Sequence, residues 1–123
     1  MPSRIPPART VQEEIVVMTF TLIEQFPDFG AELAALLRQE GEDDLAATVP
    51  NLTIVDRCRC GDDFCSTMYT VSRPVDSWGR SHRNVALHSG KGELILDILD
   101  FEIVCIEVLF RDEIRSRLLE LMP

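Results

Sequence analysis

Residues 85–109 read VALHSGKGELILDILDFEIVCIEVL, and this stretch decides the fold class of the chain. It contains three apolar runs that are separated by two short segments rich in turn-forming residues. Apolar and β-branched runs between short turns are typical of antiparallel strands. The pattern predicts a hairpin made by residues 85–88 and 93–99, followed by a further strand at residues 103–109.

A second hairpin is predicted earlier in the chain. Residues 52–57 and 65–71 are rich in β-branched or aromatic side chains, and a Gly-Asp-Asp loop joins them. If Cys60 and Cys65 bracket a four-residue loop, they face each other across the two strands. Together with the three strands above, these segments predict an antiparallel meander of about five strands.

The N-terminal part of the chain predicts a long helix. Thr10 and Glu13 fit a capping box, in which each side chain satisfies a backbone N–H of the first turn. Apolar residues then recur at spacings of three and four from Val11 onward, which gives one buried stripe. Pro27 is expected to end this helix.

Further helices follow the first one and close the chain. Asp28 can cap a second helix that Gly41 stops, so the first two helices form a hairpin. The acids of residues 42–44 suit the first turn of a short third helix, where they complement the helix dipole. Residues 111–121 place acids early and apolar residues on one face, so we expect a C-terminal helix.

The order of these elements predicts an α+β fold. A helical hairpin of two or three helices would pack on the antiparallel meander, with the C-terminal helix added at the end. Residues 10–123 are expected to form one domain, and the proline-containing residues 1–9 a disordered leader. No signal peptide or apolar run of roughly 20 residues is present, so the sequence predicts a soluble cytoplasmic protein with no membrane span.

Charge is unevenly spread along the chain. The formal net charge is −9, and residues 10–56 hold ten acidic residues against one arginine. An acidic surface repels phosphate backbones, which argues against nucleic acid as a partner. It favours a small interaction protein of the bacterial inhibitor, immunity or antitoxin type, whose acidic helical face would attract a basic protein. The alternative is that the charge only keeps a small domain soluble.

Two groups of residues are candidates for partner contact. One is the acidic run at the start of the third helix, and the other is a loop that combines tryptophan with arginines, residue types that dominate interface hot spots. An edge strand or the tryptophan would also suit a homo-oligomer. The candidate contact residues are Glu42, Asp43, Asp44, Arg73, Trp78, Arg80 and Arg83.

Three of the four cysteines lie within eight residues, at Cys58, Cys60 and Cys65. The two-residue period of a strand puts Cys58 on the same face as Cys60, so all three sulfurs would point to one side of the hairpin. With His82 as a fourth ligand they would bind zinc, although C-x-C differs from the usual C-x₂₋₄-C pairing. Asp62, Asp63 and His88 are the other candidates for the fourth position.

Other interpretations of these cysteines remain open. The thiols would also suit inert packing beneath the helices, a Cys60–Cys65 bridge, or a redox or nucleophilic centre of a thiol enzyme. Cys105 lies in an apolar run and is expected to be an inert core residue. No nucleotide-binding or hydrolase motif is present, and the sequence gives no catalytic residue.

Overall fold

The computed structural model describes residues 19–72, 79 and 81–123. Within these ranges, no helix combines the length and the apolar character that crossing a membrane requires. The helices and strands, in chain order, are β1 (Phe20–Thr21), α2 (Leu22–Gln25), α3 (Pro27–Gln39), α4 (Asp43–Thr48), the 3₁₀ helix η1 (Val49–Asn51), β2 (Thr53–Ile54), β3 (Asp56–Arg57), β4 (Met68–Tyr69), β5 (His82–Leu87), β6 (Glu93–Leu99), β7 (Glu102–Leu109) and α5 (Asp112–Leu121).

The strands form two antiparallel sheets. Strands β1 and β2 make a small sheet, and a five-stranded sheet has the order β3-β4-β7-β6-β5. The α+β class and the C-terminal helix predicted from the sequence are confirmed. Strands β5, β6 and β7 follow one another as a meander, whereas β4 pairs with β7 rather than with its successor β5. Strand β7 is therefore hydrogen-bonded on both of its edges.

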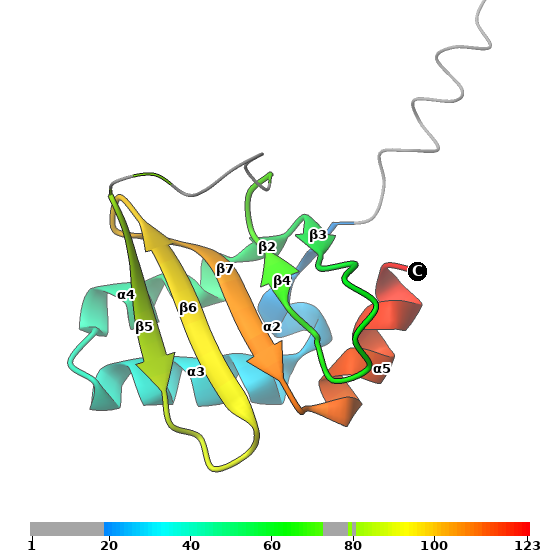
Figure 1. The fold of residues 1–123 in the computed structure, drawn as a ribbon. Coiled ribbons are helices and arrows are strands. Elements are labelled where there is room, and N and C mark those ends of the chain that lie inside the picture. Colours follow the sequence, from blue (N-terminus) through cyan, green and yellow to red (C-terminus); the bar gives the residue numbers. More distant parts are fainter. Residues whose placement is uncertain (1–18, 73–78, 80) are drawn as a thin grey trace, which may run out of the picture.

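The two faces of the five-stranded sheet differ in what covers them. Met68, Leu96 and Ile106 point to one face and belong to the main core cluster, which also includes the buried residues of the helices. Figure 1 shows α2, α3 and α4 behind this face. In the part of the chain that is described, no helix lies over the opposite face, which we call the helix-free face.

Helix α3 shows how the sequence sets the helical layer. Phe29, Leu33 and Leu37 recur every four residues and are all buried against the sheet. The helix ends where Gly41 adopts a φ of 77°, a conformation that costs glycine little. The Gly41 N–H bonds to the Arg38 carbonyl and the Glu42 N–H to the Leu37 carbonyl, which is a Schellman ending. The predicted second and third helices are thus present as α3 and α4, although α3 begins at Pro27 and Phe26, not Asp28, is its N-cap residue.

The prediction of one long helix up to Pro27 is wrong at its end. Phe20 and Thr21 form strand β1, where they pair with Ile54 and Thr53. Aromatic and β-branched residues pair well in strands, and the tertiary partner β2 outweighs the helical spacing. The predicted helix start and the leader fall on residues 1–18, which lie outside the described residues.

The predicted strand at residues 52–57 is divided between the two sheets. Thr53 and Ile54 pair with β1, whereas Asp56 and Arg57 pair with Tyr69 and Met68. Val55 lies between them, and its N–H donates to the carbonyl of Tyr69. This segment therefore joins the small sheet to the large one.

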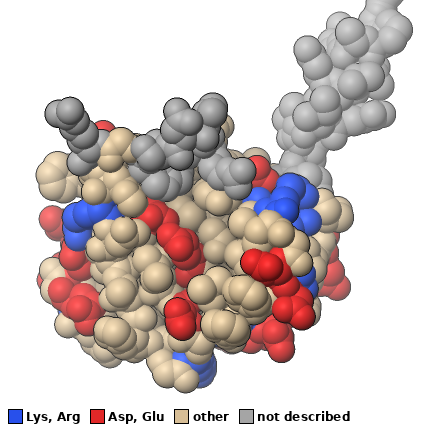
Figure 2. All heavy atoms as spheres, viewed as in Figure 1, with Lys and Arg blue, Asp and Glu red and all other residues tan. Residues whose placement is uncertain are grey.

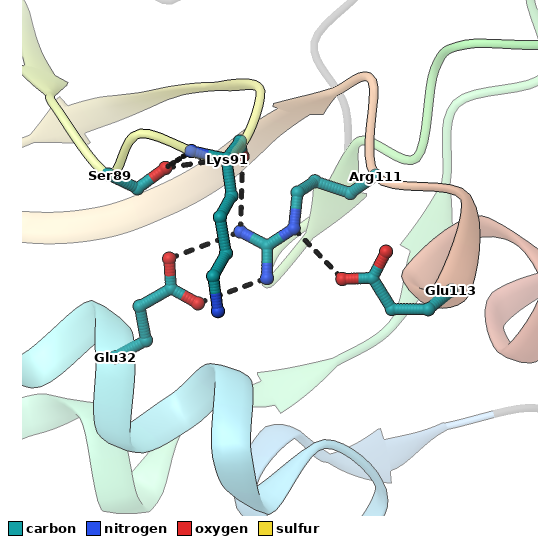
Figure 3. Close-up of polar contacts among 5 residues, drawn as sticks. All are labelled: Glu32, Ser89, Lys91, Arg111 and Glu113. Atoms are coloured by element: carbon teal, nitrogen blue, oxygen red, sulfur yellow. Dashed lines mark hydrogen bonds and ion pairs between the residues drawn. The ribbon is translucent and has the colours of Figure 1, made fainter.

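A buried arginine fixes the C-terminal helix to the rest of the fold (Figure 3). Arg111, which precedes α5, is only 6% exposed. Its two terminal nitrogens donate to the Glu32 carboxylate of α3 at 3.0 and 3.1 Å, and its Nε donates to Glu113 at 3.0 Å. The guanidinium also lies 5.5 Å from the ring centre of Phe29, and the Lys91 carbonyl accepts a long bond of 3.4 Å.

The contacts of Arg111 link three separate parts of the chain, namely α3, the β5–β6 turn and the start of α5. Burial opposes the charge of Arg111, but the carboxylates of Glu32 and Glu113 outweigh it and raise its pKa. A buried charge that loses its partner is costly, because the remaining group stays desolvated without compensation. We therefore expect the fold to depend on this ion pair.

Replacing Arg111 with alanine should lower the free energy of unfolding by about 3–5 kcal/mol, since Glu32 is left without its counter-charge. Glu32→Ala should have a comparable effect, and the two losses should not add in a double-mutant cycle measured by urea denaturation. Glu113→Ala is the control, because the Glu113 side chain is 66% exposed. This substitution should lower the free energy of unfolding by less than about 1 kcal/mol. Additive losses for Arg111→Ala and Glu32→Ala would contradict the expected coupling.

Candidate metal centre and the adjoining polar cluster

Strand register places the thiols on the helix-free face. The Cys58 N–H donates to the Thr67 carbonyl at 2.9 Å, so Cys58 lies opposite Thr67. The backbone of Cys65 pairs with that of Leu109, at the end of β7, in an isolated antiparallel β-bridge. Because side chains alternate along a strand, Cys65, Thr67 and Tyr69 share one face, opposite to that of the core residue Met68. Cys58 and Cys65 thus lie on the helix-free face at the β3–β4 end of the sheet.

The three thiols predicted as metal ligands lie together in the structure. The sulfur atoms of Cys58, Cys60 and Cys65 are all within 4.8 Å of one another. All are free thiols; Cys60 is exposed, and Cys58 and Cys65 are half-buried. Tetrahedral zinc with Zn–S bonds of about 2.3 Å requires sulfurs roughly 3.8 Å apart. The thiols therefore need to move only slightly to share one ion.

Polar groups around the sulfurs stabilise negative charge on them. Partial burial opposes ionisation of Cys65, but bonds from the Thr67 hydroxyl and N–H, and from the neighbouring thiols, outweigh it and lower the pKa of Cys65. The Asp62 N–H favours the Cys60 thiolate, yet the proximity of Cys58 and Cys65 raises the pKa of Cys60 to about 11. When Cys65 ionises, its thiolate is thus hydrogen-bonded by the remaining thiols. N–H···S bonds of this kind also support metal-bound thiolates.

The hairpin that carries the thiols differs from the predicted one. Cys60 and Cys65 are not cross-strand partners, because pairing between the two strands ends at Cys58 and Thr67. The loop is therefore longer than four residues. The sulfurs still converge, since Cys65 is held in place by strand β7 rather than by β3.

His82 does not join the thiols. It lies on β5, the far edge strand of the sheet, and its Nε2 is 2.7 Å from Oδ1 of Asp97. Among the described residues, the thiol group contains no fourth ligand from a histidine or carboxylate. The predicted role of His82 as the fourth ligand is therefore not supported by its position.

A second cluster of ligand-type side chains lies on the same face, centred on Asp97. Asp97 is only 4% exposed, and its Oδ1 accepts bonds of 2.7 Å from His82 Nε2 and from Asn84 Nδ2. The register pairs Asp97 with Cys105, and Glu107 is two residues further along β7. Ligand atoms of Asp97, Cys105 and Glu107 all lie within 4.8 Å of one another. We call Asp97, Cys105 and Glu107, with His82 and Asn84, the Asp97 cluster.

The two carboxyl groups of this cluster have very different proton affinities. The hydrogen bond to Asp97, together with burial, raises the pKa of Glu107 to about 7. Burial opposes ionisation of Asp97, but bonds from Glu107, His82, Cys105 and Asn84 outweigh it and lower its pKa. Burial and the nearby Asp97 carboxylate raise the pKa of the Cys105 thiol. Below about pH 7, the pair thus holds one proton between two carboxylates.

Sequence reasoning did not identify the Asp97 cluster. Cys105 was expected to be an inert core residue, and it is buried, with a raised thiol pKa. The strand register in addition places it beside Asp97 on the helix-free face. The available signal was charge within apolar strands, since Asp97 and Glu107 each interrupt a run of apolar residues. Only the strand register shows that these interruptions lie next to each other.

The structure describes only some of the residues predicted to contact a partner. Arg73, Trp78 and Arg80 lie outside the described residues. Arg83 and Glu42 bind each other, with nitrogen–oxygen distances of 3.0 and 3.2 Å, and this bond lowers the pKa of Glu42. The two aspartates that begin α4, Asp43 and Asp44, are exposed.

A cleft of about 600 Å³ lies away from both clusters, between α3, the β5–β6 turn and α5. Asp28, Lys91 and Arg117 contribute to its wall, beside the buried Arg111. Every terminal nitrogen of Arg111 already donates to a carboxylate. The cleft therefore borders a structural ion pair.

Searches against protein-family models, curated proteins and solved structures found no match to this chain.

The raised pKa of Glu107 predicts a pH-dependent stability of the metal-free protein. In the folded state Glu107 keeps its proton up to about pH 7, whereas its ordinary value is 4.5. The contribution of protonated Glu107 to the stability of the fold is therefore fully present below pH 4.5 and is lost as the pH rises through 7. The free energy of unfolding should fall across this range by about 1–3 kcal/mol.

Glu107→Gln should lack this fall, because the amide stays neutral at every pH. The measurement is urea denaturation in the presence of a chelator across that pH range. Glu102→Gln, an exposed residue at the start of the same strand, is the control and should follow the wild type. Parallel pH profiles for the wild type and Glu107→Gln would show that Glu107 titrates normally.

Proposed function

We propose that this protein is a metal-binding module that holds zinc through the thiolates of Cys58, Cys60 and Cys65. The observation that carries this proposal is the convergence of three reduced sulfurs within 4.8 Å of one another. Soft thiolate ligands select zinc over the hard cations magnesium and calcium. The donor set is therefore chemically suited to zinc.

A zinc ion at this place would close the loop that joins β3 to β4, beside the end of β7. Cys58 extends β3, Cys60 lies in the loop, and Cys65 contacts the end of β7. Only two residues of β3 pair with β4, so backbone pairing holds this hairpin weakly. Metal binding would add the cross-link that the short strands do not provide, and binding energy becomes folding energy.

The fourth coordination position is reached from solvent in this proposal. Cys60 is exposed, and so are the aspartates of the same loop, Asp62 and Asp63. Water or one of these carboxylates would complete a tetrahedral site. The ion would thus serve either to fix the hairpin or to hold a ligand contributed from outside.

Zinc content tests the proposal. Protein purified without chelator should contain at least one zinc per chain by elemental analysis, and Cys60→Ser should lower this number by about one. Thr53→Ser, an exposed residue on the short strand β2, is the control and should keep the wild-type zinc content. Adding zinc to the chelator-treated wild type should also raise its melting temperature.

Equal zinc content in the wild type and Cys60→Ser would contradict zinc binding by the thiols. Fast alkylation of Cys65 that added zinc does not slow would also contradict it. That second result would instead favour the thiol-based redox function, which the lowered pKa of Cys65 makes chemically reasonable.

A second candidate function is binding of a basic protein through the acidic helical layer. Its support is local: Asp43 and Asp44 are exposed at the start of α4, and neither forms an ion pair with another described residue. Charge at such a surface speeds association with a basic partner and loses its effect in salt.

Replacing both aspartates with asparagine should weaken recovery of a basic partner from the source lysate, with a larger difference at low salt than at high salt. The control is Glu120→Gln, an exposed acid on α5. Equal recovery by the wild type and the double variant, or no basic partner at low salt, would contradict this function.

A further inference from the structure

The Asp97 cluster combines four kinds of ligand chemistry on adjacent strands. Two carboxylates, a thiol, an imidazole and a carboxamide come from β5, β6 and β7. Strand pairing fixes their positions, since Asn84 and Cys105 are the register partners of Asp97 on its two sides. Groups fixed on central strands are already in place before a ligand arrives, as metal sites require.

The cluster brings two carboxyl groups together without a lysine or an arginine beside them, and the only basic side chain in contact with Asp97 among the described residues is His82. Asp97 is almost fully buried, and its side-chain partners among the described residues are His82, Asn84, Cys105 and Glu107. None of these is a lysine or an arginine, and the basic side chain next to His82, Arg83, binds Glu42 instead. Two carboxylates in contact in a low-dielectric site need a positive charge, which a proton or a metal ion can supply.

From these observations we propose that the Asp97 cluster is a second metal site, which binds a divalent transition-metal ion such as zinc through Asp97, Glu107 and Cys105. Binding releases to solvent the thiol proton of Cys105 and any proton that the two carboxyl groups hold. A set of carboxylates and one thiolate suits zinc and its neighbours better than magnesium.

His82 and Asn84 act as positioning residues for this site. Both donate to the same oxygen of Asp97, Oδ1, and so leave Oδ2 outside these two bonds. Hydrogen bonds of this kind hold a ligating carboxylate in one orientation. His82 thus orients Asp97 in this proposal, whereas the sequence predicted it as the fourth ligand of the thiol site.

The site is open to solvent on one side. Glu107 is only half-buried and lies on the helix-free face. Figure 2 views the molecule from this side, where acidic side chains lie among uncharged ones and basic side chains lie toward the margins. A cation therefore meets attractive charge on the face that leads to Glu107.

The second site has ligands of its own, distinct from those of the thiol site. By the strand register, Glu107 is opposite Thr67, and Thr67 is opposite Cys58, so two strand spacings of roughly 10 Å separate Glu107 from Cys58. Cys65 is nearer, because it pairs with Leu109 of β7. The two sites share no ligand. Either one can therefore exist without the other.

Zinc stoichiometry of the reduced, chelator-treated full-length chain tests the inference by calorimetric titration. The wild type should bind two zinc ions, and Glu107→Gln one, because the amide cannot replace the carboxylate. Cys60→Ser should also bind one, and the control Glu102→Gln two. Glutamine keeps a hydrogen bond to Asp97, so Glu107→Gln is expected to fold, and circular dichroism checks this.

The outcomes separate this inference from the proposed function. One ion in the wild type that is lost in Cys60→Ser and kept in Glu107→Gln overturns the second site only. One ion in the wild type that is kept in Cys60→Ser and lost in Glu107→Gln overturns the thiol site only. Cadmium-113 NMR of the wild type gives an answer without variants: two resonances are expected, one shifted far downfield by three sulfur ligands and one well upfield of it. A single downfield resonance overturns the second site.

Discussion

The structure depends on the pairing of strand β7 with neighbours on both of its edges. Through β4, this strand holds Cys65 and thus the hairpin that carries the thiols. Through β6, it brings Cys105 and Glu107 against Asp97. An antiparallel register that slips by one residue moves every side chain to the opposite face, so both clusters rely on the same set of backbone hydrogen bonds.

The two faces of the sheet differ in the kind of side chain that they bury. The covered face buries apolar side chains against α2, α3, α4 and α5, and the ion pair of Arg111 with Glu32 fixes α5 to that layer. The helix-free face instead contains polar groups that are buried by one another, with Asp97 at their centre. Such groups are costly to bury unless they are satisfied, and their shared hydrogen bonds reduce that cost. Both clusters of ligand-type side chains therefore lie on the face that contributes less to the apolar core.

Much of the fold could be predicted from local pattern. The turns around Gly90 and Asp100 separated β5, β6 and β7, and Gly41 ended α3 where the Schellman geometry requires a positive φ. The prediction failed where a distant partner decided the outcome. Phe20 and Thr21 follow a helical spacing but pair with β2, because a hydrogen-bonded neighbour outweighs a small propensity difference.

The sequence by itself determined the α+β class, the order of the C-terminal strands and the grouping of three cysteines near one turn, since each of these follows from residues close together in the chain. Tertiary structure alone decided which distant residues meet. It separated His82 from the thiols, paired Arg83 with Glu42, and placed the buried Cys105 next to Asp97. The physical reason is that β4 pairs with β7, more than 30 residues away, and no local period encodes that choice.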